Sequence, residues 1–230
     1  MYPVTYSAQN PGEGRNRLTA FFRYFVSITW AIVGANYGFV AEIAAFIAWF
    51  ALVFTGRYPD GLYDFNAGYM RYMARYGGFN YLLTDDWPPF NGAEDPSYPI
   101  QLGVPQPKPE YNRMKALFRL IVGIPVMLLA IVQGVILAVC YIIAWFSILF
   151  TGRISEGLFD PMRSASAYLL RTTAYFLLMT EDWPPFSFEE GEGAPAGQLP
   201  ATPPPAQAPS APAPEAGQQP PPPPPPPAGS

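Results

Sequence analysis

Two long apolar stretches constrain the fold of this chain more than any other feature. Residues 24–54 contain one acidic side chain, Glu42, and residues 120–150 contain no Asp, Glu, Lys or Arg. Each run exceeds the roughly 18 apolar residues that indicate a membrane segment. Only 13% of all residues are charged, against roughly a quarter in an ordinary soluble domain. We therefore expect an all-α integral membrane protein.

The chain is also a tandem duplication. Residues 1–90 align with residues 97–186 without a gap, and roughly a third of the aligned positions are identical. The segment Phe54-Thr-Gly-Arg57 returns at residues 150–153, and Asp86-Trp-Pro-Pro-Phe90 returns at residues 182–186. We expect two membrane repeats, 1–90 and 97–186, that share one local structure.

The duplicated motifs resemble a known bacterial membrane family, domain of unknown function 4389. The resemblance covers residues 1–186 as two copies. It implies a helical fold and a membrane setting, and no activity. The second copy departs from the pattern at Ile154-Ser155 and at Pro161. The matching motifs are Tyr2-Pro3-Val4, Asn16-Arg17, residues 48–65 and residues 84–90.

The apolar runs leave two topologies open. A helix over 31 residues would be about 46 Å long, whereas the hydrocarbon core of a bilayer is about 30 Å thick. Each repeat therefore contains one long tilted helix or a compressed helical hairpin with its tip near Gly38 or Gly134. Hairpins place all 13 basic residues on one side, and single crossings split them almost evenly. In either topology we expect a multi-pass protein of the bacterial cytoplasmic membrane, with a cytoplasmic tail.

Other elements flank each apolar run. Aromatic-rich residues 62–83 and 158–179 carry scattered charges, which predicts amphipathic helices in the headgroup plane. Tyr2–Tyr6 and Tyr98–Leu102 are expected to form short strands. We expect these strands to pair with the residues that follow each Pro-Pro-Phe.

Charged and aromatic residues near the predicted helix ends form the candidate site. A guanidinium beside a carboxylate suits either lipid headgroup binding or the fixing of a turn between helices. The candidates for these two roles are Arg57, Asp64, Arg75, Arg153, Asp160 and Arg171. Arginine and tryptophan also anchor helices at the membrane interface. The expected interfacial anchors are Trp87, Trp183, Arg23 and Arg119.

Glu42 is an expected intramembrane acid. An ionisable group in an apolar run is costly and indicates a function. The equivalent residue of the second repeat is Ala138, so a duplicated mechanism would not depend on this acid. Packing, an oligomer contact and proton handling all stay open.

The residue types that are missing limit the chemistry. The chain has no histidine and one cysteine, so hydrolytic triads, zinc sites and disulfides are not expected. We expect no catalytic residue, no cofactor and no metal. Too little basic charge is present for nucleic-acid binding.

The tail, residues 187–230, differs in kind. It is acidic and rich in Pro and Ala, a composition that predicts disorder. Pro220–Pro227 would form a polyproline II rod, which suits either a polyproline-binding protein or a spacer.

These features predict a non-enzymatic membrane anchor or scaffold, an accessory of a cell-envelope complex that contacts lipid and recruits partners through its tail. A homo-oligomer is one candidate assembly. The alternatives are a lipid-handling or transport subunit and a membrane-shaping hairpin protein.

Overall fold

The computed structural model of the chain describes residues 2–12 and 14–185. They all lie in one unit. The expected disordered tail and its segment Pro220–Pro227 lie outside the described residues. The elements are β1 (Thr5–Ala8), α1 (Arg17–Thr55), α2 (Asp60–Asn80), β2 (Ile100–Gly103), α3 (Arg113–Leu117), α4 (Arg119–Val122), α5 (Ile124–Thr151) and α6 (Glu156–Phe176).

The first apolar run forms one helix, α1, of 39 residues. The Asn16 side chain caps it by accepting a hydrogen bond from the Thr19 N–H at 3.0 Å. Gly56 ends it with a φ of +74°. Gly38 lies in mid-helix, where an added Cβ would come within 2.9 Å of the Tyr69 hydroxyl oxygen. The hairpin alternative is therefore wrong here, because Gly38 admits a neighbouring ring instead of reversing the chain.

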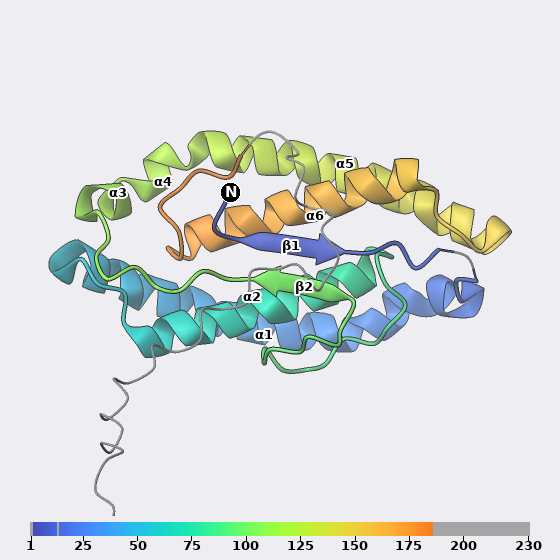
Figure 1. The fold of residues 1–230 in the computed structure, drawn as a ribbon, viewed down its shortest axis with the longest axis horizontal. Coiled ribbons are helices and arrows are strands. Elements are labelled where there is room, and N and C mark those ends of the chain that lie inside the picture. The colour runs from blue at the N-terminus through green and yellow to red at the C-terminus, as the bar shows by residue number, and fades with distance from the viewer. Residues whose placement is uncertain (1, 13, 186–230) are drawn as a thin grey trace, which may run out of the picture. The chain divides into compact units, whose positions relative to one another are not determined.

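The second apolar run is helical too, but it is divided between α4 and α5. The short helix α3 precedes them, and the three helices follow one another along one edge of the molecule (Figure 1). The last break falls at Gly123, two residues before Pro125. Proline has no N–H to donate to the preceding turn, and its ring crowds that turn. Gly134 lies inside α5, so a hairpin is wrong for this repeat as well. The membrane-shaping alternative assumed such hairpins, and neither repeat forms one.

The two predicted amphipathic helices are present as α2 and α6. Each is followed by a leucine in left-handed backbone geometry, Leu82 with a φ of 62° and Leu178 with a φ of 65°. This geometry is unfavourable for a branched side chain. Both leucines are buried, and we attribute their tolerance of the strain to the apolar area that they remove from water.

The two strands pair with each other. Both predicted strands overlap the observed ones, but the expected pairing with the residues after the first Pro-Pro-Phe is wrong. The residues after the second Pro-Pro-Phe lie outside the described residues. β1 and β2 are antiparallel, and Tyr6 lies opposite Leu102. These two residues are equivalent in the duplication. Exchanging the two repeats therefore leaves the pairing of the strands unchanged. A pseudo-two-fold axis therefore passes through this pair and relates the repeats.

Reciprocal contacts at the helix ends support the same axis. The backbone N–H of Arg15 donates to the Gly152 carbonyl at 3.0 Å, and the backbone N–H of Tyr111 donates to the Gly56 carbonyl at 2.8 Å. Arg15 corresponds to Tyr111, and Gly152 corresponds to Gly56. The start of each long helical stretch thus lies beside the end of the other, so α1 and α5 run antiparallel (Figure 1).

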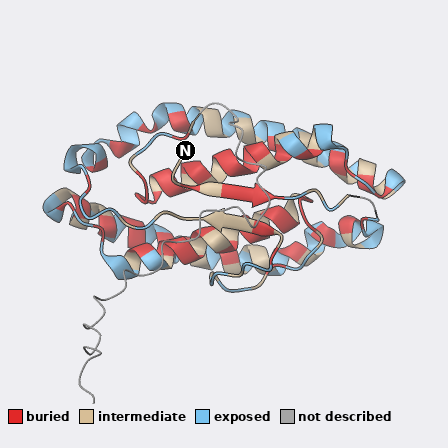
Figure 2. Cartoon of the chain, viewed as in Figure 1, coloured by how far each residue is buried: buried red, intermediate tan, exposed pale blue. Residues whose placement is uncertain are grey.

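The elements form three layers. The strand pair packs on α2 and α6, which contact each other, while α1 packs on α2 and α5 packs on α6. Burial concentrates in β1, α2 and α6, and the outer sides of α1 and α5 are exposed (Figure 2). The layer formed by α1 and α3–α5 lies farthest from the strands.

Candidate functional site

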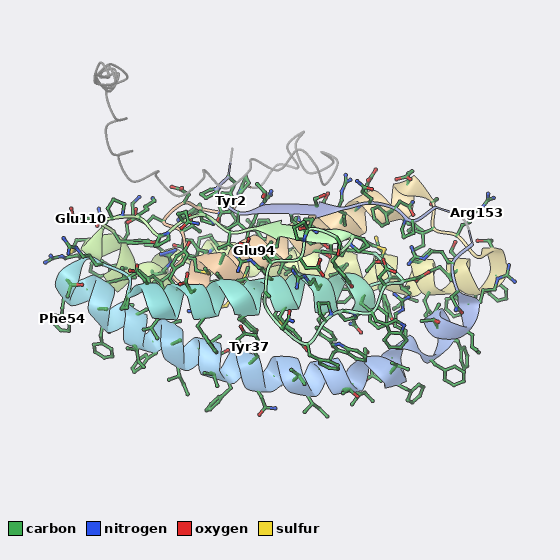
Figure 3. All side chains as sticks on the ribbon, turned by 60° about the horizontal axis from the view of Figure 1, so that its bottom comes forward. Tyr2, Tyr37, Phe54, Glu94, Glu110 and Arg153 are labelled. Carbon is green, nitrogen blue, oxygen red and sulfur yellow. The ribbon has the colours of Figure 1, made fainter. Side chains whose placement is uncertain are left out.

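The long helices expose a surface that is almost wholly apolar. We call it the apolar face: the exposed large apolar side chains from Leu18 to Phe54 on α1 and from Met114 to Phe150 on α3–α5. Figure 3 shows the side chains of α1 pointing away from the rest of the molecule along its length. By length and composition, α1 and α5 could each cross a membrane. Only 33% and 17% of their most apolar 18-residue segments are buried. A core helix of a soluble protein would be buried for most of its length.

Arg23 lies behind this face and clamps the end of α2. Its guanidinium donates to the carbonyls of Phe79 at 2.6 Å and Thr84 at 2.7 Å. It also contacts the Asp85 carboxylate at 2.5 Å, which Arg15 reaches at 3.0 Å. Burial lowers the pKa of Arg15 from its ordinary value, and the nearby Asp85 carboxylate opposes that shift. One carboxylate therefore holds two buried arginines.

Arg119 is the equivalent clamp in the second repeat. It donates to the Thr180 carbonyl and lies over the Tyr175 ring, 3.9 Å from the ring centroid. The side chains of Arg23 and Arg119 are almost fully buried. The expectation that they reach outward to headgroups is therefore wrong, because the carbonyls left free at the ends of α2 and α6 bind them instead.

Arg75 and Arg171 also have interior partners. Arg75 donates to the Ala93 carbonyl at 2.7 Å and lies 5.9 Å from the Tyr98 ring centroid. Arg171 donates to the Val4 carbonyl at 3.2 Å and lies 5.4 Å from the equivalent ring of Tyr2. These contacts tie the opening segment of each repeat to an amphipathic helix of the other repeat. They favour a structural role over headgroup binding.

The predicted arginine–carboxylate pair is not formed in the first repeat. Arg57 and Asp64 are both exposed, and no ion pair joins them within the part of the chain that the structure describes. Asp160 pairs with Arg163 at 3.1 Å. Arg153 is exposed just beyond the end of α5, so Arg57 and Arg153 remain candidates for headgroup contact.

The two predicted tryptophan anchors are half exposed, Trp87 at 52% and Trp183 at 42%. Trp87 packs against the rings of Trp30 and Phe79, with centroids 5.4 and 5.1 Å away. The Trp30 indole N–H donates to the Pro88 carbonyl at 2.8 Å. The Pro-Pro segment of the first repeat is thus fastened to α1, and an interfacial role for both tryptophans stays a prediction.

Glu42 lies on the exposed side of α1 between two cavities. One, of about 370 Å³, lies between α1 and α2 and includes Tyr69 and Tyr76 in its lining. The other, of about 490 Å³, lies between α1 and the second repeat, and its lining includes Glu42, Arg119 and Thr172 among apolar side chains. The Nε atom of Arg119 is buried and has no hydrogen-bond partner. The larger cavity therefore combines apolar walls with one acidic and one basic group.

The family comparison agrees with the duplicated geometry. The family model described as a domain of unknown function (DUF4389) matches residues 17–91 and 113–187, which together cover more than half of the chain. The chain belongs to the DUF4389 family. No curated protein and no solved structure matches it. The two DUF4389 matches begin at the first residues of α1 and α3, so both β strands lie outside them.

Sequence reasoning missed the contacts that join the two DUF4389 repeats. The Trp49 indole N–H donates to the Ala116 carbonyl, and the equivalent Trp145 donates to the Ala20 carbonyl, both at 3.0 Å. The duplicated Trp-Phe pair was the available signal, but the duplication alone does not reveal that each indole crosses to the other repeat.

The described residues offer little metal-binding chemistry. Within residues 2–12 and 14–185, no group of three or more His, Cys, Asp or Glu side chains is placed to hold a metal ion. Cys140 is partly buried on α5.

Proposed function

We propose that this DUF4389 protein is a non-enzymatic anchor and scaffold of the bacterial cytoplasmic membrane. The apolar face carries the proposal. Exposed apolar side chains follow two long helices from end to end, far beyond the few hundred Å² of apolar patch that a soluble monomer ordinarily exposes. Lipid is the solvent that such a surface fits.

The opposite side would serve as the scaffold. The strand pair, the loop at residues 91–98 and the exposed charges of α2 and α6 lie away from the apolar face, where they can meet soluble partners. In this proposal the Pro-rich tail, including Pro220–Pro227, recruits a component of a cell-envelope complex. Deleting residues 187–230 should leave membrane retention intact and reduce the co-purifying proteins. An unchanged set of proteins would refute the recruiting role.

A lipid carrying a photoreactive diazirine on its acyl chain tests the membrane proposal. Full-length protein in bilayers should be labelled in peptides from residues 18–54 and 114–150. Peptides from residues 60–80 and 91–103 serve as internal controls and should stay nearly free of label. Label spread evenly over the chain, or protein released from membranes by alkaline carbonate, would contradict the proposal.

The larger cavity favours a second candidate function, lipid handling. Its walls include Phe46, Trp49, Leu120 and Phe176, with Glu42 and Arg119 as the charged groups. An acyl chain fits such walls, and a polar head could contact the charged groups. The equivalent region, between α5 and the first repeat, contains Tyr81 and Tyr141, whose ring centroids are 6.1 Å apart.

Ala45→Tyr tests this second function. Ala45 lines the cavity, and the equivalent residue in the other repeat is Tyr141, so the substitution copies a ring that the protein already accommodates. Native mass spectrometry should show lipid retained by the wild type and several-fold less retained by the variant. Val53→Tyr, farther along α1 and outside the cavity lining, is the control. Equal retention by all three proteins would refute lipid handling at this cavity.

A further inference from the structure

The length of the apolar face is the first clue to how the protein meets a bilayer. The 39 residues of α1 are about 58 Å long, whereas the hydrocarbon core is about 30 Å thick. Fitting α1 into that thickness would need a tilt of about 60°, beyond the range of about 0–40° that membrane-spanning helices show. The exposed apolar side chains nevertheless continue almost to both ends of the helix.

Charged groups halfway along the molecule are the second clue. Tyr37 lies near the midpoint of α1, and Gly68 of α2 packs between the Tyr37 hydroxyl and the Gly92 backbone. The loop that follows Gly92 carries Glu94, whose carboxylate contacts Arg71 at 2.6 Å and whose side chain is 70% exposed. Figure 3 shows Glu94 and Tyr37 at the same level along the long axis. If α1 crossed the membrane, this ion pair would lie at the centre of the bilayer, where charges are most costly.

The basic residues are the third clue. Arg17 lies beside Gly152 at one end of the paired long helices, and Arg113 lies beside Gly56 at the other end. Arg153 and Arg57 directly follow these two glycines. A crossing orientation would divide these arginines evenly between the two compartments, against the positive-inside rule. An orientation with the helices parallel to the membrane surface keeps all of them on one side.

We propose that the protein lies flat in one leaflet, a placement that rests on the proposed membrane binding. The pseudo-two-fold axis then coincides with the membrane normal. The α1 and α3–α5 helices lie among the upper acyl chains, and the strand pair and the Glu94 loop face the water. Both repeats have the same orientation toward the membrane, and neither crosses it.

Labelling of Gly61 and Gly157 distinguishes the two orientations. These equivalent glycines are exposed, lie at opposite ends of the helix pair, and have open space where a side chain would begin. Gly61→Cys and Gly157→Cys would each be made in full-length protein that carries Cys140→Ala. A membrane-impermeant maleimide would then be applied to spheroplasts and to inside-out vesicles, with detergent-solubilised protein as the fully labelled reference.

The flat orientation predicts that both positions react in the same preparation and that both are protected in the other, with at least a fivefold difference in labelling. Reaction of the two positions in opposite preparations would show a crossing protein and overturn the proposal. Protection of both positions in both preparations would also overturn it, because the proposal places both in water. Protein that is absent from the membrane fraction would instead refute the membrane anchor itself.

Discussion

The long helical stretches of the two repeats begin and end alike, but only the first is continuous between its ends. In both repeats an asparagine caps the long helical stretch, a left-handed glycine ends it, and a tryptophan bonds to the other repeat. The first repeat has the continuous helix α1, and the second is broken near Gly123 and Pro125. The shared ends make the contacts between repeats, so those contacts constrain the sequence more than helix continuity does.

A second difference lies at the clamps. In the first repeat, Asp85 neutralises two buried arginines, Arg15 and Arg23. In the second, the equivalent Glu181 pairs with Lys108 at 3.0 Å, and the Lys108 side chain is 42% exposed. The basic partners of Asp85 are buried, whereas the basic partner of Glu181 is partly exposed.

Asp85→Asn should cause the largest loss of stability. It leaves two buried guanidiniums without a counter-charge, so we expect a loss of about 3–5 kcal/mol in the free energy of unfolding. Glu181→Gln removes a partly exposed pair and should cost about 0–1 kcal/mol. Denaturant titration of both variants in detergent micelles checks the difference, and equal losses would show that the two clamps are equivalent.

Exchanging the residues at the helix break tests the second contrast. Thr29 is the exposed equivalent of Pro125 and lies well inside α1. Thr29→Pro should cost about 3 kcal/mol, because it removes a helical hydrogen bond and crowds the preceding turn. The reciprocal Pro125→Thr should change stability by less than about 0.5 kcal/mol, because α4 and α5 already accommodate the break. A large loss from the reciprocal exchange would mean that the break itself stabilises the second repeat.

The reciprocal tryptophan contacts should respond alike. Trp49→Phe and Trp145→Phe each remove one indole hydrogen bond of 3.0 Å between repeats. Each should cost about 0.5–1.5 kcal/mol, and the two losses should agree within about 0.5 kcal/mol. Thermal unfolding of the two single variants and of the double variant measures this. Strongly unequal losses would argue against the pseudo-two-fold relation.

The smallest expected effect is on the pH dependence of stability. Burial raises the pKa of Glu181, but hydrogen bonds from the Asn112 N–H and Lys108 outweigh burial, so the pKa lies below its ordinary value. Because the folded-state pKa is lowered, this stabilisation is present above the unfolded-state pKa of about 4.3 and is lost as the pH falls through the folded-state value. Glu181→Gln should therefore unfold with a shallower pH dependence than the wild type between about pH 5 and pH 3. Identical slopes would exclude this contribution.

Some of this structure could be predicted from the sequence because it depends on local signals. The helix caps at Asn16 and Asn112, the terminating glycines and the amphipathic helices follow from neighbouring residues. The roles of Arg23 and Arg119 could not be predicted, because an arginine one turn inside an apolar helix also suits headgroup contact. Their true partners, backbone carbonyls at or just beyond the ends of α2 and α6, are brought close only by tertiary packing.

The hairpin expectation failed for a related reason. Gly38 is compatible with a turn, but it is also compatible with a helix that packs against an aromatic ring, and Tyr69 supplies that ring. The strand pairing failed because the nearest segment in sequence is not the nearest in space. Instead, the opening strand of each repeat pairs with the equivalent strand of the other repeat.

Immersion depth is the most direct test of a single apolar face that both repeats share. Nitroxide labels would be placed singly at Phe25, Phe39 and Phe54 of α1 and at their equivalents Ile121, Val135 and Phe150, all of which are exposed. Relaxation by oxygen and by a polar nickel complex reports the depth of each label in bilayers. We predict that all six depths agree within about 5 Å, well inside the roughly 15 Å half-thickness of the hydrocarbon core. Labels at Phe39 and Val135 that lie 10 Å or more deeper than the labels at the helix ends would contradict the account.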